Sequence, residues 1–333
     1  MNYRQQLLNS LLIAPASRAT LAQQLGVTRA YMTRLSSELI AQGIIVEEGA
    51  QEGDFGRPQM LLALAQGRYY SISVMVRGYR LEAYLCDYAR PTVTLAQCDH
   101  DFISAQSTAA VLHQLEQVIV QLTAAAQVSR QQLRHVGIAL QGGIEQFSGV
   151  VRRCPLFQET QIAFKTQLGE QIGIDVAVMN IAWCSSVMIQ RALPQLNSWL
   201  ALLPGLGSLG YGLFLNGSVV LGDNGYYPEI VHLPFAGGME NAFQPQQEQN
   251  ALEALCFAIC CTAPVHNLRH VVLAGEFFDS APDTLIPELR QRLAQHPLEQ
   301  INTLDITWLR LGHNQSLQGL LTLSAEAVSA CLI

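Results

Sequence analysis

The chain has 333 residues, which is long enough for two or three domains. Half of its residues are hydrophobic and only 14% are charged, and this composition excludes an intrinsically disordered protein. The formal net charge of −7 would disfavour nucleic acid if it were evenly spread. Residues 1–43, however, contain four Arg and one Glu, a net charge of +3, which leaves −10 for the remainder. The charge distribution therefore indicates a basic head on an acidic body.

The composition also favours a cytoplasmic protein. The first residues do not read as a secretory signal, because Arg4 is followed by two glutamines and only a short apolar run. No apolar stretch reaches membrane-spanning length. None of the eight cysteines forms a C-x-x-C pair, and Cys256, Cys260 and Cys261 fall in an apolar helical run where thiols act as small hydrophobic groups. We therefore expect a reduced protein of the cytoplasm.

Residues 3–43 predict three short helices. Leucines at helical spacing predict the first of them over residues 3–13. Thr20 is a candidate N-cap for the second helix and Thr28 for the third. Gly26, between these two helices, supplies the sharp turn. Two short helices joined by a glycine turn predict a helix-turn-helix.

The two apolar segments that follow, residues 44–49 and 59–65, flank a glycine-rich tip and predict the wing of a winged helix. We therefore assign a winged helix-turn-helix DNA-binding domain to residues 1–67. Arginine reads guanine edges, whereas threonine and tyrosine contact phosphates or thymine methyl groups. The candidate DNA contacts lie on the exposed face of the third helix and at the wing tip; they are Thr28, Arg29, Tyr31, Thr33, Arg34 and Arg57.

The body of the chain predicts a mixed α/β fold. Residues 69–97 alternate between apolar and polar side chains and predict three antiparallel strands. A helix is expected over residues 107–127, followed by a buried strand that runs into Gln141-Gly142-Gly143. Further helices are expected at residues 159–172 and after the strand of residues 173–180. Residues 199–222 predict a strand, a glycine loop and a hairpin.

Residues 225–254 combine two acids and a histidine in a pattern that suits a polar ligand. Glu229 and His232 stand in P-E-I-V-H, and Glu253 stands in A-L-E-A. Carboxylates accept hydrogen bonds and imidazole donates or accepts them. The three side chains together can therefore hydrogen-bond several hydroxyls of one ligand. The pattern predicts a binding site for a polar ligand that carries several hydroxyls.

This segment resembles the ROK family of sugar kinases and sugar-responsive repressors. There it reads roughly G-E-I-G-H, then C-x-C-G-x-x-G-C-x-E, and Glu229, His232 and Glu253 match its acids and histidine. The helix pair followed by Gly56-Arg57-Pro58 also resembles the head of ROK repressors. The strand-to-helix junction of the family carries Asn-Asp, and Asn180 aligns with this pair. The resemblance implies that Asn180, Glu229, His232 and Glu253 contact the ligand.

The resemblance implies an α/β fold in two parts. A winged helix-turn-helix is followed by a two-lobed, actin-like (ribonuclease H-like) ATPase-fold ROK domain over residues 68–333, which senses the ligand and forms oligomers. One lobe would span approximately residues 68–180 plus the C-terminal helix, and the other residues 181–316. The ligand would lie in the cleft between them.

The features that a ROK kinase needs are altered at four places. The D-x-G-G-T phosphate turn reads Met75 to Tyr79, where Arg77 and Tyr79 would block approach of a phosphate. The general base falls on Asn180 or Ile181, and neither accepts a proton at neutral pH. The second phosphate loop, residues 206–210, is degenerate. The fourth place is the zinc site, where Gln244, Gln246 and Ala251 replace three cysteines. In addition, Leu156 stands where the family has a sugar-binding Asn. We expect no metal, no other cofactor, no ATP binding and no enzyme activity.

The leading hypothesis is a DNA-binding transcriptional regulator, a repressor of carbohydrate genes that senses a sugar or sugar phosphate through a catalytically dead ROK domain. Its expected partners are a double-stranded DNA operator and copies of itself in a dimer or tetramer, with no membrane. An alternative is a regulator that binds no sugar and is controlled by a protein such as a phosphotransferase-system component. A divergent sugar kinase is the third hypothesis.

Overall fold

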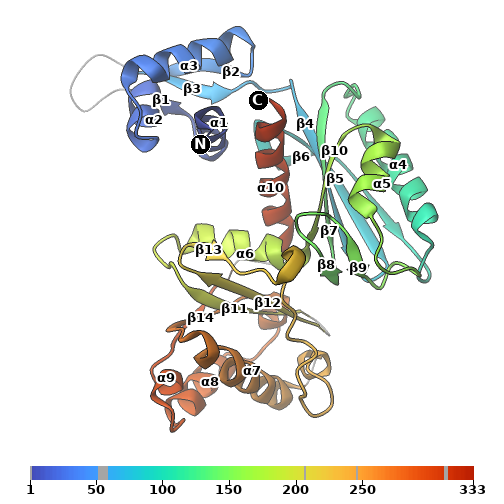
Figure 1. Cartoon of the computed structure of the whole chain (residues 1–333), viewed down its shortest axis with the longest axis vertical. Coiled ribbons are helices and arrows are strands. Elements are labelled where there is room, and N and C mark those ends of the chain that lie inside the picture. The colour runs from blue at the N-terminus through green and yellow to red at the C-terminus, as the bar shows by residue number, and fades with distance from the viewer. Residues whose placement is uncertain (1, 52–58, 206–207, 245–246, 311–313) are drawn as a thin grey trace.

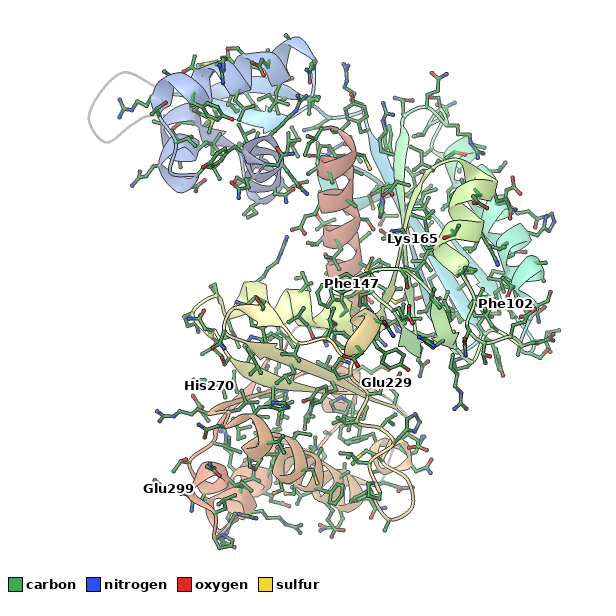
Figure 2. The ribbon with its side chains drawn as sticks, viewed as in Figure 1. Phe102, Phe147, Lys165, Glu229, His270 and Glu299 are labelled. Carbon is green, nitrogen blue, oxygen red and sulfur yellow. The ribbon has the colours of Figure 1, made fainter. Side chains whose placement is uncertain are left out.

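The computed structural model describes residues 2–51, 59–205, 208–244, 247–310 and 314–333 (Figure 1). Within these ranges, no helix combines the length and the apolar character that are needed to cross a bilayer. The chain forms a small N-terminal head and a body with two five-stranded sheets, drawn with side chains in Figure 2. Both termini lie at the head end of the molecule.

The head consists of three helices and a three-stranded sheet in the order β1-β3-β2. Its buried leucines come from all three helices and from the sheet, so one core holds the head together. β2 and β3 are antiparallel, as the wing prediction requires, and the tip between them, with Arg57, lies outside the described residues. The elements are α1 (Tyr3–Ile13), β1 (Ala16–Ser17), α2 (Arg18–Gln24), α3 (Arg29–Ala41), β2 (Ile45–Gln51) and β3 (Gln59–Leu64).

One of the two predicted helix caps is confirmed and the other is wrong. Thr28 caps α3, because its hydroxyl accepts a hydrogen bond from the Tyr31 N–H at 3.2 Å. The cap of α2 is Ser17 instead of Thr20, and the Thr20 N–H donates to the Ser17 hydroxyl at 3.2 Å. Gly26 adopts a φ of +64° at the turn, a value that favours glycine. α2, the turn at Gly26 and α3 therefore follow one another in the order that the predicted helix-turn-helix requires.

The first body sheet has the order β10-β7-β4-β5-β6. β4, β5 and β6 are antiparallel neighbours, whereas β4, β7 and β10 are parallel. The helix expected from residue 159 begins at Phe164, and it covers one face of the sheet together with α4. The elements are β4 (Tyr70–Arg77), β5 (Arg80–Asp87), β6 (Arg90–Asp101), α4 (Thr108–Ala125), β7 (Leu133–Leu140), β8 (Gly143–Ile144), β9 (Val151–Arg153), α5 (Phe164–Ile172) and β10 (Asp175–Asn180).

The second body sheet repeats this topology in the order β13-β12-β11-β14-β15. Its first three strands in the chain are antiparallel and its last two run parallel to β11, so each sheet has the strand order 3-2-1-4-5. The predicted two-lobed α/β fold is confirmed. The strands are β11 (Trp199–Gly205), β12 (Ser208–Leu215), β13 (Ser218–Val219), β14 (His270–Leu273) and β15 (Asp305–Trp308). The helices on its outer side are α7 (Glu248–Thr262), α8 (Leu285–Ala294) and α9 (Glu299–Asn302), and the short 3-10 turns are η1 (Asp223–Gly225), η2 (Glu240–Phe243), η3 (Pro264–His266) and η4 (Glu276–Asp279).

Two helices, α6 (Ile181–Ala192) and α10 (Gln315–Cys331), fill the space between the sheets. α10 packs on the first sheet, whereas α6 contacts both α10 and the second sheet. The two helices meet at Gly319, where an added Cβ would lie 1.9 Å from the carbonyl oxygen of Cys184. Only glycine permits this backbone approach.

α10 also joins the body to the head. Ala325 and Val328, in its last turns, belong to the same buried cluster as the leucines of the head. The hydroxyls of Tyr88 and Ser329 are hydrogen-bonded at 2.8 Å, and Tyr88 is itself part of that cluster. The Gly67 N–H donates to the carboxylate of Asp87 at 2.6 Å. The head is therefore anchored by α10 and by the turn that follows β5.

Gly319→Ala tests the contact between α6 and α10. The added methyl group overlaps a backbone carbonyl, and overpacking of this kind costs about 1–3 kcal/mol. We expect the midpoint of thermal unfolding to fall by several degrees, at about 2–4 °C per kcal/mol. Gly169→Ala in α5 is the matched control, because its Cβ would meet nothing closer than 3.8 Å. This control should retain or raise the midpoint through helix propensity. Equal midpoints for Gly319→Ala and the wild type would contradict the packing described here.

Candidate functional site

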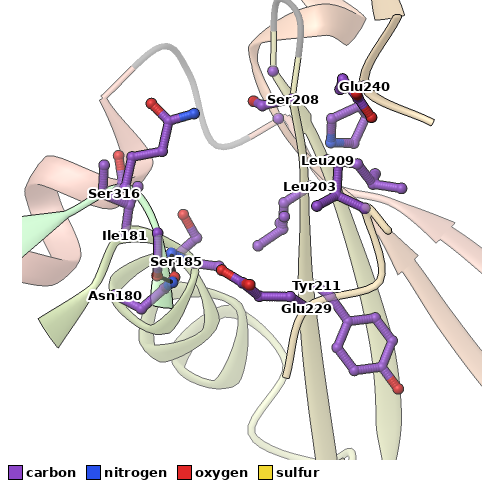
Figure 3. Close-up of a pocket in the computed structure, with 18 of the residues that line it drawn as sticks. Asn180, Ile181, Ser185, Leu203, Ser208, Leu209, Tyr211, Glu229, Glu240 and Ser316 are labelled. Carbon is purple, nitrogen blue, oxygen red and sulfur yellow. Dashed lines mark hydrogen bonds between the residues drawn. The ribbon is translucent and has the colours of Figure 1, made fainter. Parts of the chain in front are cut away.

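A cavity of about 660 Å³ opens where strands from both sheets end (Figure 3). Arg77, Asn180 and Gly205 are the last residues of β4, β10 and β11. Gln141 follows β7 directly and Gly275 follows β14 by two residues, and all five residues line the cavity. Ligands of open α/β sheets bind outside the carboxyl ends of the strands. The volume is within the range of small-molecule sites.

Glu229 and His232, two of the residues predicted to contact a ligand, both line this cavity. Figure 3 shows Glu229 reaching from its loop toward the side where Asn180 and Ser185 lie. The Tyr226 hydroxyl donates to the Glu229 carboxylate at 3.4 Å. Burial, followed by the charge of Glu229, raises the pKa of Tyr226, so its hydroxyl stays protonated as a donor. The Glu229 carboxylate remains open to further donors such as ligand hydroxyls.

Asn180 lines the cavity, but its amide is largely used within the protein. Its Oδ1 accepts from the Ala182 N–H at 2.7 Å and so caps α6. Its Nδ2 donates to the Gly142 carbonyl at 2.6 Å. Asn180 therefore fixes the loop after β7 against the start of α6, and it has one remaining amide hydrogen to offer a ligand.

Glu253 is the candidate that the structure does not bring to the cavity. It is exposed on α7 and is not among the described residues that line the cavity. The Gln249 amide donates to its carboxylate at 3.2 Å, a contact within one turn of the helix. Leu156, at the family's asparagine position, is fully buried in the core of the first sheet.

Several polar residues of the cavity were missed by the sequence reasoning. Ser185, on α6, is 4% exposed, and in the described part of the chain its hydroxyl has no hydrogen-bond partner. Gln315 and Ser316, in the first turn of α10, also line the cavity. Arg77 was predicted only as an obstruction, whereas its guanidinium donates to the Ser316 hydroxyl at 2.8 Å. Tyr79 is exposed and is not part of the described lining.

The described residues do not fit the zinc site that the resemblance implies. A structural zinc needs four sulfur or imidazole ligands in a tetrahedral array. His232 supplies one imidazole, Gln244 offers only an amide, and Ala251 is buried in the apolar core of the second lobe. Among the described residues, no three His, Cys, Asp or Glu side chains are grouped closely enough to hold a metal ion. Gln246 lies outside them.

The helix-turn-helix presents a second candidate surface on α3. Thr28, Arg29, Thr33 and Arg34 are exposed along its N-terminal half. Tyr31 is half-buried, because its ring packs edge-on against Tyr3 at 5.8 Å and lies under the Arg34 guanidinium at 5.3 Å. Tyr31 therefore packs beneath this surface and contributes little to its exposed area.

The fold defines a class of protein in which a small helical head precedes a body of two similar α/β lobes, with a cavity where the strands of both lobes end. The chain belongs to the ROK family, whose model matches residues 94–262, just over half of the chain. A crystal structure of a ROK family transcriptional regulator, a homologue of the E. coli Mlc protein, is similar over 99% of this chain and 98% of its own, at 18% identity and a TM-score of 0.72.

The body alone is similar to ROK kinases. A glucokinase from Streptomyces griseus, solved with glucose and AMPPNP, covers 77% of this chain and 99% of its own, at 14% identity and a TM-score of 0.58. The "Uncharacterized protein y4fQ" of Sinorhizobium fredii is 26% identical over 141 residues, which are 42% of this chain and 35% of that protein. The match spans about a third of that relative's length.

The changed zinc positions predict that the purified chain contains far less than one zinc ion per molecule. Elemental analysis of protein prepared without chelator checks this, and a chelator should leave the unfolding midpoint unchanged, because no folding energy comes from a metal. A content of about one zinc per chain would contradict the argument from ligand type. Cys256→Ser with Cys260→Ser would then show whether those thiols replace the family ligands.

Proposed function

We propose that this chain is a DNA-binding transcriptional regulator, a repressor of carbohydrate genes, which senses a sugar or sugar derivative in its cavity and does not phosphorylate it. The observation that carries the proposal is that one helix, α10, extends from the cavity to the core of the head. Its first turn lines the cavity, and its last turns belong to the core of the head. A ligand that shifts α10 would therefore act on the DNA-binding surface.

The DNA side of the proposal rests on α3. Its exposed residues include Arg29 and Arg34. Among the ion pairs of the described residues, Arg34 lies 3.9 Å from the carboxylate of Glu38 and Arg29 contacts no acid. Exposed arginines on the second helix of a helix-turn-helix lie where such helices enter the major groove. A single head reads few base pairs, so we propose a dimer or tetramer on a two-fold symmetric site.

The ligand side rests on the mixture of donors and acceptors in the cavity. Glu229 accepts hydrogen bonds, Ser185 donates or accepts, and His232 does either. A polyhydroxylated ligand satisfies all of these groups. Phosphoryl transfer to it is disfavoured, because Asn180 and Ile181 hold an amide and an apolar side chain where the resemblance puts the base.

Operator binding tests the DNA side. The full chain is used to select fragments from a random duplex pool, and affinity for the selected site is measured by fluorescence anisotropy. Arg29→Ala and Arg34→Ala should each weaken binding by about 1–3 kcal/mol if they contact bases, and reduce its salt dependence if they contact phosphates. Arg292→Ala, which removes an exposed arginine from α8 at the far end of the body, should change neither.

Selection of no sequence by a folded protein would overturn the DNA-binding assignment. Equal affinities for the wild type, Arg29→Ala and Arg34→Ala would move the surface away from α3.

Calorimetry with a panel of sugars and sugar phosphates tests the ligand side. Glu229→Gln keeps the shape of the side chain and removes its charge, so it should weaken the binding of the active ligand by about 1–3 kcal/mol. Glu253→Gln is the matched control and should bind as the wild type does, because its carboxylate is outside the cavity lining. Equal binding by both variants would remove Glu229 from the site. Binding of no member of the panel would favour control by a protein partner.

A further inference from the structure

Two arginines lie against one tyrosine ring where the head meets the body. The guanidinium carbon of Arg68 is 5.5 Å from the centre of the Tyr69 ring, and that of Arg134, in β7, is 5.1 Å from it. The Arg68 Nε also donates to the Tyr69 hydroxyl at 3.2 Å. Both arginines are exposed and Tyr69 is half-buried. An aromatic face orients a guanidinium but does not neutralise it, so both charges remain available to a partner.

No acid neutralises these two guanidiniums in the described part of the chain, because none of its ion pairs includes Arg68 or Arg134. Asp87 and Asp175 lie at the same end of the first body sheet. Asp87 is 2% exposed and accepts from two backbone N–H groups, at 2.6 and 2.9 Å. The Asp175 carboxylate is 2.7 Å from the Nδ1 of His135. Although the body as a whole is acidic, this end of it therefore presents unpaired positive charge.

The connector that bears Arg68 is held on the body, and its side chain reaches the end of α3. The Gly67 carbonyl accepts from the Gln132 amide at 3.2 Å, and the Tyr69 carbonyl accepts from a backbone N–H of the body at 2.9 Å. A Cβ added to Gly43, which follows the C-cap of α3, would lie 2.5 Å from the Arg68 Nη1. The two arginines therefore begin where α3 ends.

α3 is longer than the groove that such a helix enters. Its 13 residues span about 20 Å at 1.5 Å per residue, whereas the major groove is about 12 Å wide. With the N-terminal half, from Thr28 to Arg34, against the bases, the C-terminal end emerges beside the sugar-phosphate backbone. Arg68 lies at that end, on the side where the head joins the body and β4 begins (Figure 1).

We propose that Arg68 and Arg134 bind phosphate groups of the DNA strand that flanks the groove occupied by α3. This contact rests on the proposed DNA-binding function and adds to it a second surface, which the body supplies in part. A guanidinium donates to phosphate oxygens through a fixed fork of N–H groups. Phosphate contacts set the register of a protein on the duplex and carry no sequence information. The contact of Arg134 would also hold the body in one orientation relative to the DNA.

The salt dependence of DNA binding tests this contact without knowledge of the operator. The affinity of the full chain for a mixed-sequence duplex of about 30 base pairs is measured between about 50 and 200 mM salt, because each phosphate contact adds about 0.9 to the slope of log K against log salt. Arg68→Ala and Arg134→Ala should each reduce the slope by about 1. Arg134→Lys keeps the charge and should keep the wild-type slope. Arg292→Ala, on α8, is the control and should keep it as well.

Equal slopes for the wild type, Arg68→Ala and Arg134→Ala would overturn the phosphate contact. A loss of affinity at constant slope, or an Arg134→Lys variant that behaves as Arg134→Ala does, would also overturn it, since either result assigns the arginines to packing on Tyr69. No binding of the duplex by the wild type at low salt would overturn the DNA-binding assignment itself, and this contact with it.

The selected operator provides an independent readout. Arg134→Ala should weaken binding to the operator and to the mixed-sequence duplex by the same factor, because every sequence has the same phosphates. Arg29→Ala, on the exposed face of α3, is the comparison and should weaken operator binding by the larger factor, as a base contact does. A loss in Arg134→Ala that is confined to the operator would contradict the phosphate assignment and leave the DNA-binding function in place.

Discussion

The contact of α6 with α10 at Gly319 is the constraint on which the rest of the structure depends. The backbones approach so closely that no side chain fits between them. This contact brings the capped start of α6, at Asn180, and the first turn of α10 to the edge of one cavity. α10 then extends about 25 Å, at 1.5 Å per residue, to the core of the head. A helix that begins at the cavity and ends in the core of the head is the physical basis for the coupling that we propose.

Much of the fold was predictable because its signals are local. Thr28 and Gly26 identify the start of α3 and the turn before it, and the alternating residues 69–97 correspond to the antiparallel strands. Ser17 was missed as a cap because Ser17 and Thr20 are both favoured N-cap residues and the local pattern does not choose between them. The pairing of Ser17 with Leu61 of β3, which involves a distant segment, keeps the backbone extended up to Ser17. The parallel pairing of β4 with β7 and β10 likewise joins segments far apart in the chain, so only the family resemblance indicated it.

The residues that line the cavity were predictable only where they belong to a sequence motif. Glu229 and His232 share one short segment, and both line the cavity. Glu253 belongs to the same motif, but its position on α7 turns it toward solvent and Gln249. Arg77 and Gln315 are separated by more than two hundred residues, and they meet because β4 ends where α10 begins. No pattern in a single sequence records a meeting of that kind.

The central claim is that the cavity and the DNA-binding surface are coupled. Reciprocity requires that, if a ligand changes affinity for the operator, the operator changes affinity for that ligand by the same factor. The direct test is calorimetry of the sugar that binds, on the full chain alone and on the chain saturated with the selected duplex. The account predicts that the ligand affinity differs between the two by about 5-fold or more. Identical affinities in the free and DNA-bound protein would contradict it.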